Sequence, residues 1–266
     1  MKFFEAKRGR AKQAGNCLTS FQIDHFGISE IGLVRSNNED VWSALPDKQF
    51  YVLADGMGGH QAGEVASSFA VETMNRCMHS LPDHSDVETA CRLLRDAIAA
   101  ANTKVYEEAH RNADYAGMGT TLSCFLLIEK FLIYGHVGDS RLYRYRNRLQ
   151  QLTEDHSLRQ TLCNREEEKK SSPLLIRNVI TRAIGTHPTI LPDIGVIPLR
   201  SKDIYMLCSD GLSDYADEQT IGRILASPLS LEEMGRNLVE SALEKGGNDN
   251  ITLLLVRISD EKNLSR

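Results

Sequence analysis

The sequence has few cysteines, and none of them lies close to another in the chain. The six cysteines occur singly among 266 residues, at Cys17, Cys77, Cys91, Cys124, Cys163 and Cys208. This scatter excludes a Cys-x-x-Cys zinc or redox motif and gives no disulfide framework. Most of them fall within apolar periodic runs, where a cysteine behaves as a small hydrophobic residue. We therefore expect a reducing, cytoplasmic compartment.

The chain also lacks a long apolar run, an excess of positive charge and histidines at metal-ligand spacing. No hydrophobic stretch approaches the ~20 residues of a membrane span, and the N-terminus has no signal-peptide core. The net charge of −5 disfavours nucleic acid as a partner. The eight histidines include no His-x-x-x-His pair, which argues against zinc. We expect a soluble protein with neither membrane nor nucleic-acid contacts.

Residues 1–20 differ in charge from the rest of the chain. Five basic residues and the single acid Glu5 give this segment a charge of +4. Because the whole chain has a net charge of −5, the remaining residues carry −9. The basic residues are Lys2, Lys7, Arg8, Arg10 and Lys12. Such a segment could contact RNA, lipid or an acidic partner. We interpret it as a flexible, solvated N-terminal extension.

Residues 21–260 are expected to form a single domain of the α+β class. Apolar runs predict strands at 21–29, 50–55, 120–128, 131–137, 140–146, 204–208 and 251–258. Three- and four-residue periodicity predicts helices over 63–81, 87–110, 217–226 and 230–245. Strands in hairpins, with a helix pair between strand groups, favour layered α+β structure over alternating βαβ units. A charged interruption at 164–172 predicts a surface loop or flap.

Aspartates stand at the ends of four strand-like runs. Asp55, Asp139 and Asp210 each end such a run, and Asp249 comes just before another. A carboxylate at the rim of a buried strand is poorly solvated, which is costly unless a cation lies against it. We therefore expect these acids to meet at one end of a sheet and to bind a metal. Because nearly all the available ligands are oxygens, Mg²⁺ or Mn²⁺ is favoured over zinc.

Two neighbouring motifs carry further candidates. Asp-Gly is common in hairpin turns, but Asp55-Gly56 lies between a strand and a helix, so the Gly56 carbonyl could itself be a ligand. In Arg35-Ser36-Asn37-Asn38-Glu39-Asp40 an arginine lies near two acids. This is either an exposed ion pair or an arginine that binds a phosphoryl group. Asp155-His156-Ser157 has the residues of a catalytic triad, but adjacent residues rarely face one another.

Eight short motifs occur in an order that resembles the metal-dependent protein Ser/Thr phosphatases of type 2C, above all the compact bacterial members. They are Arg35-x-x-Asn38-Glu39-Asp40, Asp55-Gly56-Met57-Gly58-Gly59-His60, Gly119-Thr120-Thr121, Val137-Gly138-Asp139-Ser140-Arg141, Leu152-Thr153-x-Asp155-His156, Thr181-Arg182-Ala183-Ile184-Gly185, Ser209-Asp210-Gly211-Leu212 and Asp249-Asn250-x-Thr252. The resemblance covers residues 21–258. It implies a four-layer α-β-β-α sandwich, in which two antiparallel sheets are flanked by antiparallel helices and the metals lie at one end.

The resemblance also implies a set of metal ligands. Asp55 would bridge two ions, Asp210 and Asp249 would complete one site, and the Gly56 carbonyl would serve the other. Asp139 would contribute with Asp210 to a third, weaker site.

Three more residues receive roles by resemblance. Glu39 would hold a metal or its water, with Asp40 in support, and Arg35 would bind the substrate phosphate. Residues 159–178 would form a mobile flap.

The implied activity is hydrolysis of phosphoserine and phosphothreonine in proteins. Water activated by two Mn²⁺ or Mg²⁺ ions would attack phosphorus directly, without a phosphoenzyme. The expected partners are phosphorylated proteins, namely the substrates of a Ser/Thr protein kinase and the kinase itself.

The sequence departs from the family at two points. Met57 stands where many eukaryotic members have a histidine proposed as the leaving-group acid, so the proton would come from a metal-bound water or from His60. Ser172-Pro173 stands where bacterial relatives often have His-Pro, so substrate choice by the flap cannot be carried over. Alternative interpretations are a phosphatase restricted to one partner, an inactive phosphoprotein-binding module of the same fold, and a metal-dependent phosphodiesterase or nuclease.

Overall fold

Two antiparallel sheets of six strands each form the centre of the computed structural model. The structure describes residues 5–10, 21–58, 62–82, 85–158, 160 and 179–260. Sheet A has the strand order β1-β2-β12-β11-β8-β9 and sheet B the order β10-β7-β6-β4-β3. The strands of sheet A are β1 (Glu5–Arg10), β2 (Phe21–Glu30), β12 (Ile251–Asp260), β11 (Ile204–Cys208), β8 (Arg141–Arg146) and β9 (Arg148–Gln151). Those of sheet B are β10 (Asp193–Pro198), β7 (Phe131–Val137), β6 (Leu122–Ile128), β4 (Phe50–Met57) and β3 (Asp40–Leu45). The short β5 (Gly119–Thr120) pairs with the end of β4.

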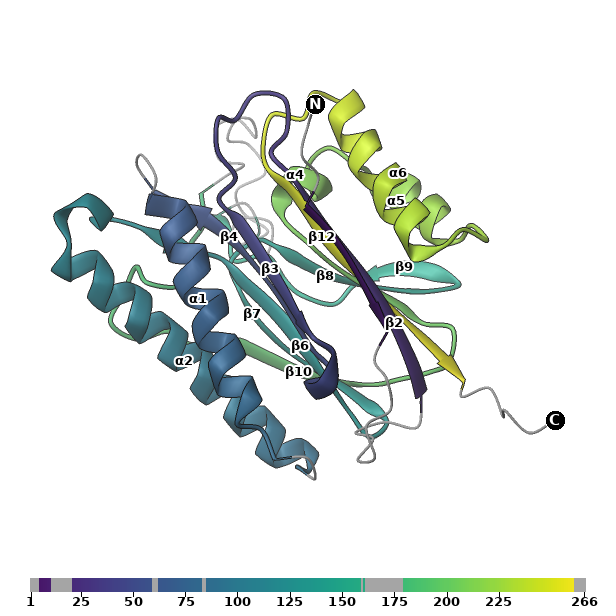
Figure 1. Ribbon diagram of the computed structural model, residues 1–266, viewed down its shortest axis with the longest axis horizontal. Coiled ribbons are helices and arrows are strands. Elements are labelled where there is room, and N and C mark those ends of the chain that lie inside the picture. The colour runs from purple at the N-terminus through teal and green to yellow at the C-terminus, as the bar shows by residue number, and fades with distance from the viewer. Residues whose placement is uncertain are drawn as a thin grey trace, which may run out of the picture.

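Helices cover the outer face of each sheet, as Figure 1 shows. The long helices α1 (Ala62–His79) and α2 (Val87–Arg111) pack on sheet B. The helices α4 (Asp210–Ser213), α5 (Glu218–Leu225) and α6 (Leu231–Glu244) pack on sheet A. Two single turns of 3₁₀-helix lie at Pro46–Lys48 and Ala113–Tyr115. The result is the four-layer α-β-β-α sandwich that the sequence predicts.

Alternation along the strands separates the hydrophobic core into layers. In β4, Phe50, Val52 and Ala54 face α1 and α2, whereas Tyr51 and Leu53 face the space between the sheets. This is the period of two that a strand buried on both faces requires. The inner layer is built from large side chains of both sheets, including Tyr51, Phe125, Leu132, Tyr205 and Leu254.

Helix ends coincide with capping residues. The side chain of Asp86 accepts a hydrogen bond of 2.7 Å from the Thr89 N–H at the start of α2. Ser230 and Glu233 form a reciprocal capping box at the start of α6. Each such cap satisfies backbone N–H groups that have no partner inside the helix.

The fold confirms the predicted helices and the seven predicted strands to within a few residues. It adds four strands that the pattern did not predict, β1, β3, β9 and β10. Glu5–Arg10, expected to be part of a flexible extension, instead pairs with β2, from Glu5 opposite Ser29 to Arg10 opposite Asp24. β9 begins at Arg148, and the single residue Asn147 separates it from the end of β8. The rest of the extension and nearly all of the predicted flap at 159–178 lie outside the described residues.

Among the described helices, none combines the length and hydrophobicity that crossing a membrane requires.

Candidate active site

The predicted acids lie at one end of the sandwich, where both sheets contribute strand ends. Asp55 is near the end of β4, and Asp40 is opposite it as the first residue of β3. Asp139 lies in the link from β7 to β8, which passes from sheet B to sheet A. Asp210 begins α4 directly after β11, and Asp249 precedes β12. The topology therefore brings together residues that are up to about two hundred positions apart.

Hydrogen bonds hold both the side chain and the backbone of Asp40. Its Oδ2 accepts a bond of 2.8 Å from the Ser209 hydroxyl, and that hydroxyl accepts a bond of 3.0 Å from the Thr252 N–H. The backbone N–H of Asp40 donates to Asn38 Oδ1 at 3.1 Å. Burial raises the pKa of Asp40 to about 6. Its Oδ1 is buried without a hydrogen-bond partner among the described residues.

The carboxyl groups also repel one another. Burial raises the pKa of Asp55 well above its ordinary value, and the charges of Asp40 and Asp210 raise it further. Burial likewise raises the pKa of Asp210, with added repulsion from Asp139 and Asp249. Like charges that share a poorly solvated site favour protonation or a bound cation. At neutral pH this arrangement therefore favours binding of a cation.

The donor chemistry fits Mg²⁺ or Mn²⁺. The cluster offers carboxylate oxygens, including the unpartnered Oδ1 of Asp40, and backbone carbonyls, which are the ligands that hard divalent ions prefer. Within the described part of the chain, no three Asp, Glu, His or Cys side chains already stand close enough to form a ligand group. Asp249 is turned toward Arg35, whose Nη2 donates to its Oδ2 at 2.7 Å. A shared cation would therefore require these side chains to move closer together.

Arg35 lies in the loop between β2 and β3, which is fixed to the loop before β12. Asn250 links them, because its Oδ1 accepts from the Glu39 N–H at 2.8 Å and its Nδ2 donates to the carbonyls of Ile31 and Asn37. The Asn37 amide donates to Glu39 Oε1 at 3.1 Å. These bonds set the positions of Arg35 and Glu39 relative to the acids.

Two glycines let the backbone approach Glu39 and Asp55. A Cβ on Gly56 would lie 2.1 Å from the Gly63 carbonyl oxygen, and one on Gly63 would lie 2.5 Å from Glu39 Oε2. The Gly56 N–H donates to the Glu39 carbonyl at 3.1 Å. Only glycine fits this contact between β4, the start of α1 and the Glu39 carboxylate.

Thr121 and Thr120 hold the backbone of Asp55. The Asp55 N–H donates to the Thr121 hydroxyl at 2.9 Å, and its carbonyl accepts from the Thr121 N–H at 2.8 Å. The Thr120 hydroxyl also donates to that carbonyl, at 2.8 Å. The Gly-Thr-Thr motif therefore fixes the strand end that carries Asp55.

His156 connects the base of the predicted flap to the link that carries Asp139. Its Nδ1 accepts a hydrogen bond of 3.1 Å from the Gly138 N–H, so Nε2 carries the proton and donates to Asp193 Oδ2 at 3.1 Å. Burial lowers the pKa of His156, which keeps the ring neutral. Backbone bonds from Leu158 to Val179 and from Thr181 to His156, of 2.8 and 2.7 Å, close the base of the segment between them.

Two other candidates from the sequence are the triad-like segment Asp155-His156-Ser157 and the histidine His60. The triad-like Asp155 is bonded to Arg141 on both carboxylate oxygens, and His156 faces Asp193, so the two do not form a relay to Ser157. His60, the candidate acid, lies outside the described residues.

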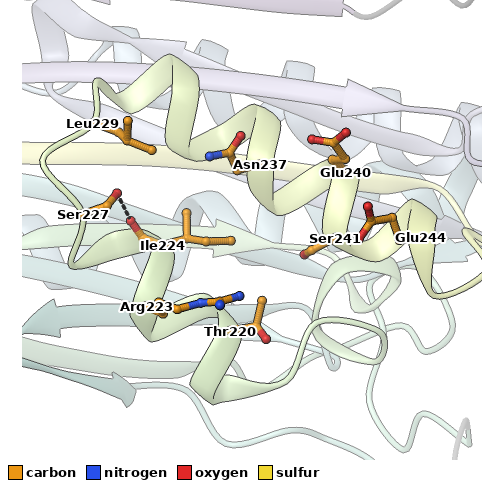
Figure 2. A pocket seen from close by; sticks show the side chains of 9 residues that line it. All are labelled: Thr220, Arg223, Ile224, Ser227, Leu229, Asn237, Glu240, Ser241 and Glu244. Atoms are coloured by element: carbon orange, nitrogen blue, oxygen red, sulfur yellow. Dashed lines mark hydrogen bonds between the residues drawn. The ribbon is translucent and has the colours of Figure 1, made fainter.

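A separate shallow groove of about 350 Å³ lies between α5 and α6 (Figure 2). Its lining includes Arg223, Ile224 and Leu229 and contains none of the clustered acids. It is therefore not part of the site.

Fold and site together define a metal-dependent hydrolase of phosphate esters. The sequence model of the family described as protein phosphatase 2C matches residues 34–254. The serine/threonine phosphatase stp of Listeria monocytogenes is 36% identical over 231 residues, 85% of this chain and 92% of the relative. The chain belongs to the protein phosphatase 2C family and is a protein serine/threonine phosphatase.

Solved structures agree with this assignment. The crystal structure of the Mycobacterium tuberculosis serine/threonine phosphatase PstP/Ppp has a TM-score of 0.80 at 35% identity, covering 89% of this chain and 99% of that one. The catalytic domain of PstP in complex with two manganese ions has a TM-score of 0.78 at 35% identity, covering 90% and 99%. Dependence on Mn²⁺ or Mg²⁺ follows from family membership and the donor chemistry.

Sequence reasoning gave no role to several residues that position the acids. Ser209, Thr121 and Asn250 act in this way through hydrogen bonds. Ser209 and Asn250 stand next to an acid in the chain and Thr121 belongs to the Gly-Thr-Thr motif, but no local pattern identifies the distant group that each one bonds.

Proposed function

We propose that the acid cluster holds two Mn²⁺ or Mg²⁺ ions. Asp55 serves both ions, Asp210 and Asp249 complete one site, and the Gly56 carbonyl serves the other. When bound, the ions supply Lewis-acid activation of water and offset charge on the phosphoryl oxygens. The observation that carries this proposal is the mutual repulsion of buried Asp55 and Asp210, which makes a cation favourable there.

Three further acids complete the proposed site. Glu39 and Asp40 support the ions from the start of β3, with Asp40 oriented by Ser209. Asp139 shares a third, weaker site with Asp210, whose pKa its charge raises.

Arg35 binds the substrate phosphate in this proposal. Its guanidinium already makes a bond to a carboxylate oxygen of Asp249, a geometry that a phosphate oxygen also satisfies. Its position in a loop fixed by Asn250 limits the reorganisation needed on binding.

The thiol beside the acid cluster is not an activated nucleophile. Cys208, directly before Ser209, is buried, and burial raises the pKa of its thiol to about 12. A thiol that stays protonated is a poor nucleophile. This supports direct attack by water on phosphorus.

The proposed partners are phosphorylated proteins, including the substrates of a Ser/Thr protein kinase and the kinase itself, in the cytoplasm. The relatives from Listeria and Mycobacterium are named serine/threonine phosphatases, which supports phosphoprotein substrates. Residues 21–260 would form the catalytic domain, with 159–178 as its flap.

The test is hydrolysis of a phosphothreonine peptide by wild-type protein and by Asp210→Asn, each with Mn²⁺ and with EDTA. We expect Mn²⁺-dependent turnover that EDTA abolishes and that Asp210→Asn reduces by at least about a hundredfold. Asp96→Asn, on the exposed face of α2, is the matched control and should retain full activity. Absence of turnover by folded wild-type protein in either metal would contradict the proposal and favour a binding module or a phosphatase restricted to one partner.

A further inference from the structure

Two large aliphatic side chains stand exposed directly before the proposed phosphate-binding arginine. Leu33 is 54% exposed and Val34 is 66% exposed, and the next residue is Arg35. Exposed single aliphatic residues are common and need no explanation. Among the exposed large hydrophobic residues of the described chain, these two alone are consecutive. This consecutive exposed pair therefore stands directly beside the proposed phosphate-binding residue in the chain.

The loop that carries them is fixed, so their exposure does not come from a loose segment. The Leu33 N–H donates to the Gly247 carbonyl at 2.7 Å. Gly32 has φ of +84°, and a Cβ there would lie 2.2 Å from the Asp249 carbonyl oxygen. Figure 1 shows this loop, between β2 and β3, beside the loop between α6 and β12. The backbone thus presents both side chains in a defined place.

The apolar surface continues beyond Leu33. The position of a Cβ on Gly247 lies 3.1 Å from Leu33 Cγ and 2.9 Å from Leu243 Cδ2, so both leucines border this glycine. Leu243 is half-buried and packs at the edge of the core on sheet A. Leu33 therefore forms the outer part of an apolar surface that rests on Leu243, and the exposed Val34 follows it directly in the chain.

We propose that Leu33 and Val34 bind an apolar side chain of the substrate protein, one or two residues from the phosphorylated residue. Consecutive residues of an extended peptide are ~3.5 Å apart. Leu33 and Val34 directly precede Arg35, and the Leu33 N–H is bonded to Gly247, two residues before Asp249, so this surface adjoins the proposed phosphate-binding site. Covering aliphatic surface would remove it from water, which favours binding. A small phosphate ester has no residue to place there.

This inference rests on the proposed function, and its test separates the two. Phosphothreonine peptides with alanine at the flanking positions are compared with peptides carrying one leucine or phenylalanine at −2, −1, +1 or +2. The quantity measured is the ratio of kcat/KM for each apolar peptide to that for the alanine peptide. Because the ratio is taken within each variant, a change in folded fraction or basal activity cancels. p-Nitrophenyl phosphate serves as the substrate without flanking residues.

We expect wild-type protein to prefer an apolar residue at one of these positions by about fivefold or more, through KM. Leu33→Ser and Val34→Ser should reduce the ratio to about one, whereas Val34→Leu should keep it. Val196→Ser is the matched control, because Val196 is 42% exposed on β10, and it should keep the wild-type ratio.

Turnover without any preference, or a preference that both serine variants retain, would overturn the inference and leave the proposed function standing. Loss of the preference in Val196→Ser as well would overturn it too, since the effect would then not belong to this surface. No wild-type turnover of any substrate, including p-nitrophenyl phosphate, would overturn both.

Discussion

Arg35 and Asp249, which are 214 positions apart, are joined by a hydrogen bond of 2.7 Å from Nη2 to Oδ2. The same arginine is the proposed phosphate ligand, and the same aspartate is a proposed metal ligand. A bound metal ion and the guanidinium of Arg35 would therefore compete for the carboxylate of Asp249. Binding of the metal would release the guanidinium for the phosphate.

Arg35→Ala should affect metal and substrate in opposite directions. We expect Mn²⁺ to bind about two- to fivefold more tightly, because a competing positive charge is removed; the gain is small because the Arg35 side chain is 48% exposed. The kcat/KM for a phosphothreonine peptide should fall by about a hundredfold. Titration calorimetry measures the first effect and steady-state kinetics the second. Arg111→Ala, on the surface of α2, should change neither. Weaker Mn²⁺ binding in Arg35→Ala would contradict the competition.

Without divalent ions, the protein should lose stability as the pH rises. Burial raises the pKa of Asp40 and of Asp139 to about 6, whereas an aspartate in an unfolded chain has a pKa of about 3.9. The folded chain therefore binds protons more tightly. Its free energy of unfolding should fall between about pH 4 and pH 6, by up to ~3 kcal/mol for each group, and remain low above that range.

The measurement is the melting temperature of EDTA-treated protein at about pH 5 and about pH 7.5, with and without Mn²⁺. Mn²⁺ should raise it more at the higher pH, where the acids are ionised. Asp139→Asn should reduce the pH dependence without added metal. An equal or higher melting temperature at the higher pH without metal would show that these acids are not protonated as described.

Gly211→Ala should damage the site through the backbone. A Cβ there would lie 2.0 Å from the Asn250 carbonyl oxygen and 3.3 Å from Asp249 Cβ, so α4 and the loop before β12 would have to separate. We expect a loss of ~2 kcal/mol in the free energy of unfolding and weaker Mn²⁺ binding. Gly222→Ala in α5 is the control. Its nearest neighbour would be 3.8 Å away, and alanine should stabilise that helix by ~0.5 kcal/mol or more. Denaturant unfolding measures the free energy of unfolding of both variants. An equal change in the two variants would contradict the prediction.

His156→Ala should loosen the hydrogen-bonded base from which the proposed flap at 159–178 extends. It leaves the Gly138 N–H without its acceptor and Asp193 without one of its two partners, at a cost of ~2 kcal/mol or more. Proteolysis within 159–178 should become faster at fixed protease concentration. His79→Ala, at the exposed end of α1, should leave the cleavage rate unchanged. Unchanged cleavage in His156→Ala would show that the histidine does not hold this base.

The strong apolar periodicity of the helices and buried strands made those elements predictable, and the strands that were missed lack it. β10 is an edge strand that contains Gly195 and Pro198, and none of its residues is fully buried. β1 has the sequence Glu-Ala-Lys-Arg-Gly-Arg, which carries no apolar pattern, and pairs with β2 through the backbone. Its strand structure depends on that neighbour and not on its own residues.

The acids were predictable because a charged residue at the end of an apolar run is a local signal. Their supports were not, because they depend on contacts between distant segments. Asn250 accepts from the Glu39 N–H across 211 positions, and Ser209 donates to Asp40 across 169. No pattern within either segment encodes such a partner.

The inner layer of Tyr51, Phe125, Tyr205 and their neighbours lies between two sheets that both contribute acids to one site. The thickness of this layer is therefore also the spacer that sets how far Asp55 stands from Asp210. A change of side-chain volume between the sheets would therefore alter the affinity for the cation at their rim, although no metal ligand is substituted. The interior of the sandwich is in this sense a remote determinant of its metal chemistry.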